Sequence, residues 1–420
     1  MMHSGKALVS LCLSLCVLLP GLLVASLLDA IDSDQLTPEA LLNDAGGSAG
    51  TETGGGRPPL RFKSDDTFRI LQLTDLHYGE SAALDLKSDE VQRAVLAAER
   101  PDLVVFSGDM VSGWHCKPSA PLLADCGPGW FAARWRQLIA PVHQAGIPYA
   151  ITLGNHDAEA ELSRRQIVDL DLRTGAPLSL TRQGPQQATG ATNYHLDILG
   201  PAGARAARGG DGTEDPAARV WLLDSGERTC PPLMFGWGCV AEDTLQWLNA
   251  TTQRLPPAPG LAFVHIPLPQ FRNAWHDGPT VGSKLEDIAC SVRDTGLLQL
   301  ARQAGIGAIY SGHDHENDFV GSVKGVRLAY GRKSGWGSYG PPQGWLRGAR
   351  VIELRLGQDM ADSETWIRQE DGSQAAQRPS TQPKDLRQLI CHCDDLAEAQ
   401  QQHEWQSQQK NSQAADIVEL

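Results

Sequence analysis

The chain has 420 residues, which is enough for one large α/β domain with tails at both ends. With 41% apolar and 20% charged residues it has the composition of an ordinary globular protein, which excludes a mostly disordered or multispanning chain. The net charge of -14 opposes binding to a polyanion, so nucleic acid is not an expected partner.

Residues 1–28 have the pattern of a signal peptide or signal anchor. Lys6 precedes an uncharged apolar run over residues 7–28, and acidic residues follow. Ala25 and Ser26 resemble a cleavage site, while the run is also long enough to remain as an uncleaved anchor. Lys6 places the rest of the chain outside the cytosol in either case. We expect a protein of the secretory pathway, extracellular or vacuolar and lumenal, that touches membrane only through a possible N-terminal anchor.

Cysteines can form disulfides in such a compartment. Cys116 with Cys126 and Cys230 with Cys239 are short-range candidates, although spacing alone does not fix connectivity. Asn249 begins an Asn-Ala-Thr tripeptide, which is a glycosylation acceptor in a secreted glycoprotein.

Three composition changes divide the rest of the chain. Residues 29–59 are rich in Gly, Ser, Thr and acids and predict a flexible linker. Residues 60–365 contain the regular patterns of a catalytic domain. Residues 366–420 form a polar, Gln-rich tail, and the Cys391-His392-Cys393 tract within it lacks the second ligand pair of a closed zinc site.

The first part of the catalytic domain alternates strand and helix patterns. Strands are expected over 68–74, 102–107 and 149–153, and helices over 88–99 and 130–144. This βαβαβ order predicts parallel strands. Later patterns predict helices over 243–255 and 296–304, an exposed loop over 200–219, and strands over 193–199, 220–224, 261–265, 308–311, 326–330 and 350–356. The strand-rich segments toward the end suggest a second sheet.

Polar motifs follow five of these strands directly. They are Asp75-Leu76-His77, Gly108-Asp109, Gly154-Asn155-His156-Asp157, His265 and Gly312-His313-Asp314-His315. Each motif alone is more often a turn or a solvated loop than a functional site. Together they combine carboxylate, amide and imidazole groups at the sheet edge where α/β proteins bind ligands. This set favours Mn, Fe or Zn, and two such ions about 3.5–4 Å apart suit displacement at phosphorus.

The order of these motifs resembles the calcineurin-like metallophosphoesterases, and the longer segments resemble their purple-acid-phosphatase-like branch. Those segments are Asp75-Leu76-His77-Tyr78-Gly79, His265-Ile266-Pro267-Leu268-Pro269 and residues 312–319. The resemblance covers roughly residues 60–360. It implies an α/β fold in four αββα layers, with two mixed β-sheets flanked by helices.

The resemblance also implies a role for each motif residue. Asp75, His77 and His315 would hold the first of two metal ions, and Asn155, His265 and His313 the second, with Asp109 bridging them. A hydroxide between the ions would be the nucleophile. His156 would contact the phosphoryl oxygen and protonate the leaving group. Asp157 would orient His156, or else be an ordinary turn residue.

One position departs from the purple enzymes. They carry a tyrosine ligand three residues after the bridging aspartate, where this chain has Ser112, while His77 is a ligand that they lack. We therefore expect a colourless enzyme with two divalent ions. Arg164 and Arg332 are candidate phosphate contacts, although a surface position is the more frequent role of such arginines.

The expected function is hydrolysis of a phosphate monoester, by an acid phosphatase or phosphoprotein phosphatase acting on a small molecule or a phosphoprotein. Phosphodiesterase activity on the same metal core is the alternative enzyme. A catalytically inactive interaction scaffold is the alternative outside catalysis, but this chain keeps all seven candidate ligands and His156.

Overall fold

The computed structural model describes residues 59–381 except 120, 124, 204–213, 233 and 343. The expected signal segment, the linker as far as residue 58, and the tail beyond 381 with its Cys391-His392-Cys393 tract lie outside the described residues. Within this described part, no helix has the length and apolar character needed to cross a membrane.

The first sheet has five strands in the order β13-β12-β1-β2-β3. β1, β2 and β3 are parallel, as the βαβαβ pattern predicted, and β12 and β13 add antiparallel strands beside β1. The strands span Thr67–Leu73 (β1), Leu103–Ser107 (β2), Tyr149–Thr152 (β3), Gly348–Arg355 (β12) and Glu364–Gln369 (β13). The helices packed on this sheet are α1 (Ala82–Glu99), α2 (Trp130–Ala145) and α3 (Arg164–Thr174).

The second sheet has six strands in the order β10-β11-β9-β8-β5-β4 and is also mixed. Its strands are β4 (Tyr194–Ile198), β5 (Ala218–Leu222), β8 (Gly260–Phe263), β9 (Ile306–Ser311), β10 (Val320–Val323) and β11 (Val326–Tyr330). Its helices are α4 (Glu242–Arg254), α5 (Gln270–Asp277) and α6 (Leu297–Gln303). The remaining short elements are η1 (Gly113–Cys116), η2 (Met360–Asp362) and a hairpin of β6 (Thr229–Cys230) and β7 (Met234–Phe235).

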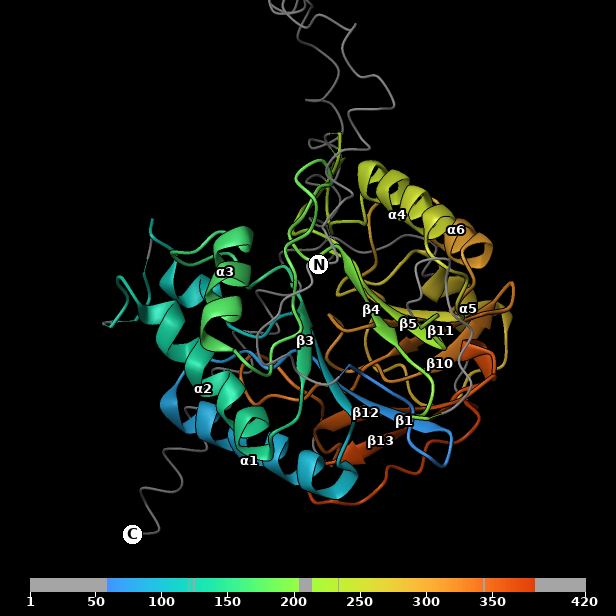
Figure 1. Ribbon diagram of the computed structural model, residues 1–420. Coiled ribbons are helices and arrows are strands. Elements are labelled where there is room, and N and C mark those ends of the chain that lie inside the picture. Colours follow the sequence, from blue (N-terminus) through green and yellow to red (C-terminus); the bar gives the residue numbers. More distant parts are fainter. Residues whose placement is uncertain are drawn as a thin grey trace, which may run out of the picture. The chain divides into compact units, whose positions relative to one another are not determined.

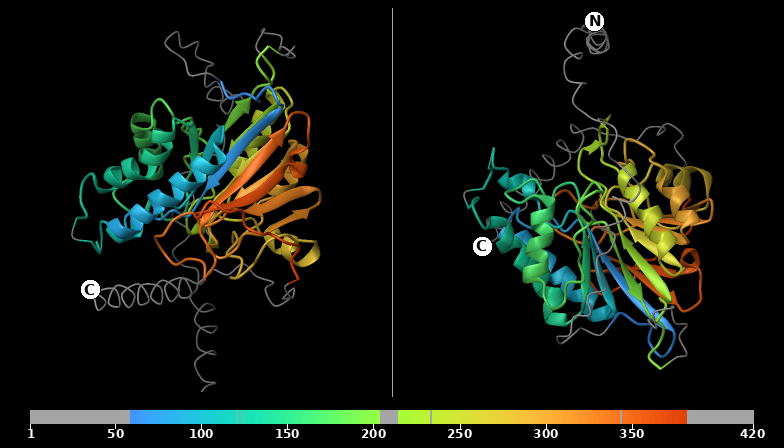
Figure 2. Two further views of the ribbon diagram at one scale, coloured as in Figure 1. Left: turned by 90° about the horizontal axis from the view of Figure 1, so that it is seen from below. Right: turned by 45° about the horizontal axis from the view of Figure 1, so that its top comes forward.

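The strands are apolar on both faces because the two sheets pack against each other and each also carries helices (Figure 1). Val104 packs toward α1–α3, whereas its neighbour Val105 packs between the sheets. Figure 2 shows the same arrangement from two other sides, with α1–α3 and α4–α6 on opposite sides of the strands. The expected four-layer αββα sandwich is therefore confirmed.

Several element boundaries differ from the sequence prediction. α1 begins at Ala82, six residues before the expected start, because the Ser81 side chain accepts a hydrogen bond from Leu84 N and caps the helix. The sequence patterns missed α3, α5, β10 and β13. β13 continues past residue 365 to Gln369, because its pairing with β12 is made by the backbone and holds a largely polar segment in the sheet.

Candidate metal centre

The candidate ligands lie just after the carboxyl ends of β1, β2, β3, β8 and β9, so the strand order of the two sheets brings them to one place. Four of them adopt a left-handed backbone conformation: φ is 54° at Asp75, 51° at His77, 49° at Asp109 and 77° at His313. This conformation costs about 1–2 kcal/mol for a residue other than glycine. Such strain clusters at functional sites, where the surrounding fold holds it.

Two glycines of the motifs are required by close packing around Asp109. Gly108 has φ +99°, and a Cβ atom there would lie 2.4 Å from His265 Nδ1. A Cβ atom on Gly154 would lie 2.2 Å from Asp109 Oδ1. The Gly-Asp and Gly-Asn-His-Asp motifs therefore need glycine so that the ligands of neighbouring strands can approach one another.

The first half-site consists of Asp75, His77 and His315, all buried. His77 Nε2 and His315 Nε2 lie 3.2 Å apart, and His315 Nε2 lies 3.6 Å from Asp75 Oδ1. The outer nitrogen of each ring is held in place: His77 Nδ1 lies 2.9 Å from Ser112 Oγ, and His315 Nδ1 lies 2.8 Å from the Tyr339 carbonyl oxygen.

The second half-site consists of Asp109, Asn155, His265 and His313, also buried. His265 Nε2 lies 3.1 Å from Asp109 Oδ2 and 3.1 Å from Asn155 Oδ1. Its Nδ1 lies 2.9 Å from the Ser107 carbonyl oxygen. Asp109 Oδ2 is also 3.8 Å from His77 Nε2, so this carboxylate lies between the two half-sites.

These contacts fit a pair of cations. A carbonyl oxygen only accepts hydrogen bonds, so His315 and His265 donate from Nδ1 and, when neutral, present a lone pair at Nε2. The His265 lone pair then faces two oxygen acceptors, which is unfavourable unless a positive charge lies among them. Aligned imidazole, carboxylate and amide donors of this kind suit first-row divalent metals.

The charges within the cluster agree with this fit. Burial and the cation of Lys333 lower the pKa of His77 and His315, so both rings are neutral near pH 7. Burial also lowers the pKa of His265, but the carboxylates of Asp109 and Asp75 outweigh it and raise that pKa to about 9. The second half-site therefore favours a positive charge, and a metal ion would take the place of the proton.

His156 lies beside the candidate ligands, with its ring centre 5.6 Å from that of His77. Its backbone N–H donates to Asp109 Oδ1 at 2.8 Å. Its Nδ1 lies 2.6 Å from Glu159 Oε2, and Lys117 Nζ pairs with the other oxygen of Glu159 at 2.9 Å. The lysine and glutamate thus hold a ring that stands next to the candidate metal ligands.

Of the two roles expected for Asp157, the contacts of its carboxylate support that of a turn residue. The Asp157 carboxylate accepts hydrogen bonds from the backbone N–H groups of Asp109, Met110, Val111 and Gly154, at 2.7–3.1 Å. A short acceptor side chain at this turn satisfies four donors that have no strand partner. Asp157 therefore shapes the loop that carries Asp109, and Glu159 has the contact with His156.

The two arginines considered as phosphate contacts have structural partners, and neither is a surface residue. Arg164 pairs with Asp224 and donates to the carbonyl oxygens of Gly154 and Leu153. Arg332 is 1% exposed, pairs with Asp318 and lies over the Trp345 ring. Both side chains stabilise loops around the candidate centre.

Two glutamates lie near the centre that no sequence pattern predicted. Glu159 contacts His156, and Glu80 accepts a hydrogen bond from Ser112 Oγ at 2.7 Å. Each stands three positions after a motif histidine. That spacing is a weak signal, because a glutamate at such a distance is common on any surface loop.

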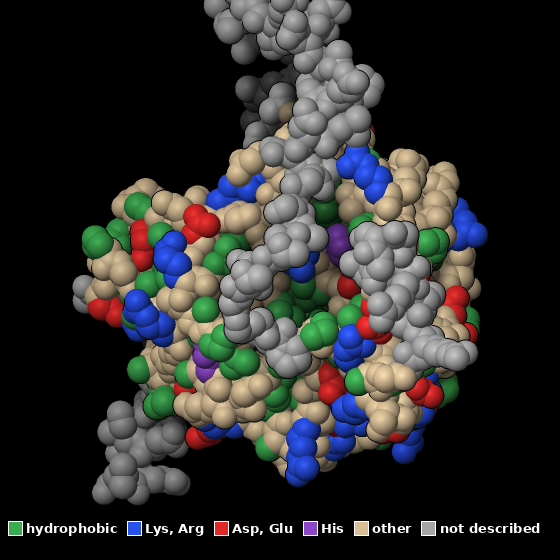
Figure 3. All heavy atoms as spheres, in the orientation of Figure 1, with side chains coloured by type: hydrophobic (Ala, Val, Ile, Leu, Met, Phe, Trp, Pro, Cys, Tyr) green, Lys and Arg blue, Asp and Glu red, His purple; other side chains and the backbone are tan. Residues whose placement is uncertain are grey.

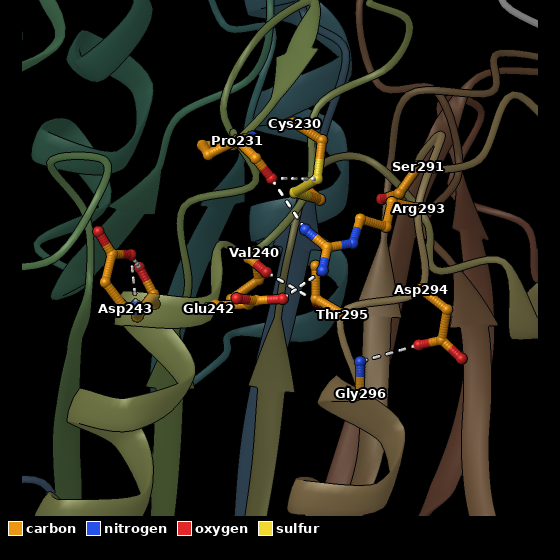
Figure 4. Close-up of a disulfide and its surroundings, with 12 residues drawn as sticks. Cys230, Pro231, Val240, Glu242, Asp243, Ser291, Arg293, Asp294, Thr295 and Gly296 are labelled. Atoms are coloured by element: carbon orange, nitrogen blue, oxygen red, sulfur yellow. Dashed lines mark hydrogen bonds and ion pairs between the residues drawn. A yellow bond between two sulfur atoms is a disulfide. The ribbon is translucent and has the colours of Figure 1, made fainter. Parts of the chain in front are cut away.

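Both expected short-range disulfides are present, Cys116–Cys126 and Cys230–Cys239. The second closes a segment that places Trp237 against His313, with ring centres 4.3 Å apart. Arg293 donates to the carbonyl oxygen of Pro231 at 3.0 Å and pairs with Glu242, which ties this disulfide to the loop before α6 (Figure 4).

Comparison with known proteins agrees with the fold and the site. The model of the family described as calcineurin-like phosphoesterase matches residues 68–317. A relative in Arabidopsis thaliana named probable inactive purple acid phosphatase 28 is 33% identical, covering 73% of this chain and 79% of its own. Phosphatase DCR2 of Saccharomyces cerevisiae is 26% identical, covering 77% of this chain and 57% of its own.

Solved structures include a dimetal phosphatase from Danio rerio, with a TM-score of 0.42 and 16% identity, covering 71% of this chain and 98% of that one. The family match spans more than half of this chain and includes every candidate ligand. The chain therefore belongs to the calcineurin-like phosphoesterase family, with relatives among the purple-acid-phosphatase-like proteins.

Proposed function

We propose that the chain hydrolyses phosphate monoesters with a dinuclear metal centre held by Asp75, His77, Asp109, Asn155, His265, His313 and His315. The single observation that carries this proposal is that these seven side chains converge from five strand ends, with buried lone-pair donors facing one another. Mn, Fe or Zn in divalent form suits this donor set. Because Ser112 contributes no phenolate, we expect the loaded protein to be colourless.

Each group near the centre has a distinct task in this proposal. The metal ions would supply positive charge for a phosphoryl group and make water acidic enough to attack near neutral pH. His156 stands outside the ligand set, where its ring can donate a proton to the departing alkoxide. Glu159 accepts a hydrogen bond from His156 Nδ1 and so fixes the orientation of the ring.

The surface provides little of the positive charge that would attract a phosphate ester. Figure 3 shows Lys and Arg interspersed with Asp and Glu on the face seen there, without a broad patch of one sign. The chain carries a net charge of -14. Recognition of the phosphate is therefore expected to depend on the metal ions, and a long polyanion such as nucleic acid remains disfavoured.

The names of three relatives favour one second candidate, a non-catalytic binding protein. Those Arabidopsis thaliana proteins, numbered 28, 29 and 14, are each named probable inactive purple acid phosphatase. The complete ligand set and the oriented His156 support catalysis for this chain instead. Activity on diesters remains the alternative within catalysis, because the same core suits both ester types.

The test uses the secreted full chain, loaded separately with Mn, Fe or Zn. Bound metal is measured by mass spectrometry, and monoesters, diesters and phosphopeptides are assayed. We expect two ions per chain and the highest kcat/KM on a monoester. Asp109→Asn and His265→Ala should each lower kcat/KM by at least about 10³-fold, because several kcal/mol of transition-state stabilisation depend on the ions.

Unchanged metal content and activity in both variants would show that the site is misassigned. Two bound ions without turnover of any ester would favour the binding-protein candidate. Entry into the secretory pathway, which the two disulfides support, is tested by glycan analysis at Asn249 and by N-terminal sequencing of the secreted chain.

A further inference from the structure

A chain of three buried side chains leads away from the first half-site. His77 Nδ1 lies 2.9 Å from Ser112 Oγ, and Ser112 Oγ donates to Glu80 Oε1 at 2.7 Å. Their exposures are 1%, 0% and 8% in that order. The backbone holds the chain together, because Ser112 N donates to the Tyr78 carbonyl oxygen at 2.9 Å, between His77 and Glu80 in sequence.

The direction of these hydrogen bonds follows from counting protons. A serine hydroxyl has one hydrogen, and here it points to the Glu80 carboxylate, which as an anion only accepts. Ser112 Oγ can then only accept from His77, so the hydrogen of the neutral ring is on Nδ1. We propose that Glu80 and Ser112 are positioning residues that fix this tautomer and aim the Nε2 lone pair of His77 into the first half-site.

A comparison of the ring contacts shows why a carboxylate is needed here. His265 and His315 donate to backbone carbonyl oxygens, which cannot reverse their role. His77 instead meets a hydroxyl, which can donate or accept with equal ease. Without Glu80, Ser112 could donate to Nδ1, and the hydrogen on Nε2 would then point at His315 Nε2, 3.2 Å away. Glu80 removes that alternative.

Opposing influences act on the Glu80 carboxyl group. Its pKa is raised, because burial outweighs the hydrogen bond from Ser112 and the nearby Lys333, which both lower it. Lys333 is fully buried, donates to the Asp75 carbonyl oxygen at 3.0 Å, and has its own pKa lowered to about 7 by burial. The Oε1 atom of Glu80 can accept from Ser112 both when the group is ionised and when a proton lies on Oε2, so the positioning role rests on the geometry of the hydrogen bond.

The inference rests on the proposed metal centre for its functional meaning, but the tautomer can be measured without metal. Metal-free protein labelled with ¹⁵N in histidine is examined by NMR near pH 7.5, and His77 is assigned with His77→Gln. We expect the shift of a protonated Nδ1 in the unaltered chain. Ser112→Ala and Glu80→Leu, which removes the acceptor of the Ser112 hydroxyl, should move the ring toward the other tautomer, whereas Ser112→Thr, which keeps the hydroxyl, should not.

Metal titration provides the second readout. Ser112→Ala and Glu80→Leu should weaken one of the two binding steps for Zn by about 10–100-fold, which is the usual effect of losing an outer partner of a histidine ligand. Ser112→Thr should restore it. Ser363→Ala is the matched control, because Ser363 is buried and its hydroxyl donates to the Met360 carbonyl oxygen away from the centre.

The outcomes separate this inference from the proposed function. A protonated Nε2 on His77 in the unaltered chain, or Zn affinities that Ser112→Ala and Glu80→Leu leave unchanged, overturns the positioning role even if the chain hydrolyses monoesters. A chain that binds no metal refutes the proposed function, while the tautomer of His77 still decides the role of Ser112 and Glu80. Melting temperatures show whether each variant is folded.

Discussion

Two disulfide-closed segments support the candidate centre in different ways. The first disulfide loop, residues 113–126, packs on the turn that carries His156: Gly113 N donates to the His156 carbonyl oxygen at 3.2 Å, and Lys117 pairs with Glu159. The second disulfide loop, residues 228–239, places Trp237 against His313, and the guanidinium of Arg228 lies over the same indole, 4.8 Å from its ring centre.

The two loops differ in the residue that each one supports. The first loop supports His156, which is outside the candidate ligand set. A substitution that disturbs this loop should therefore lower the rate of the chemical step without loss of bound metal. The second loop supports His313, a candidate ligand, so a substitution that disturbs this loop should weaken metal binding. One disulfide in each loop limits the movement of short segments that have little regular structure.

The largest expected effect tests the first loop. His156→Ala should lower kcat by about 10²–10⁴-fold, which is the usual contribution of a positioned proton donor, while two metal ions stay bound. Glu159→Gln should give a smaller loss of the same kind. Glu161→Gln is the matched control, because Glu161 accepts from Phe131 N and has no described contact with His156. Loss of metal from His156→Ala would contradict the division of roles between the loops.

The next effect tests the second loop. Trp237→Ala should weaken one Zn binding step by about 10–100-fold, because the indole supports the ring of His313. Trp237→Phe keeps an aromatic ring and should retain most of the affinity. Titration of the metal-free protein measures both variants. If Trp237→Ala changes kcat at saturating metal but not metal affinity, the two loops act alike and the comparison is wrong.

The smallest effect concerns acid stability and belongs to the first loop. Burial, with a smaller contribution from His156, lowers the pKa of His115 to about 4 from the ordinary 6.5. The folded state then binds fewer protons than the unfolded state between these values, so stability falls as pH decreases through this window. His115→Gln should remove up to about 3 kcal/mol of that loss.

Denaturant unfolding of the metal-free protein at pH 7 and at pH 4.5 measures this effect. The second loop contains no histidine and should contribute no such dependence. Equal pH dependence in His115→Gln and the unaltered chain would place the acid sensitivity elsewhere in the fold.

Local patterns predicted most of the fold. The β1–α1–β2–α2–β3 order was readable because buried strands and amphipathic helices differ in period, and because Gly146 ends α2 near its expected end. β13 could not be read in this way. Its polar side chains carry no strand pattern, and only the neighbouring β12 backbone makes Glu364–Gln369 a strand.

The sequence by itself determined the identity of the candidate ligands, because donor groups that follow strands at fixed positions form a pattern that single turns do not. Only the tertiary structure decided which other side chains form hydrogen bonds around these ligands and His156. Asp157 was expected either to orient His156 or to be a turn residue, and only its contacts with four backbone N–H groups decide for the turn. Glu159 and Glu80 make contacts that no sequence motif predicted. The physical reason is that such contacts join loops from different strands, and their distances depend on how the sheets pack.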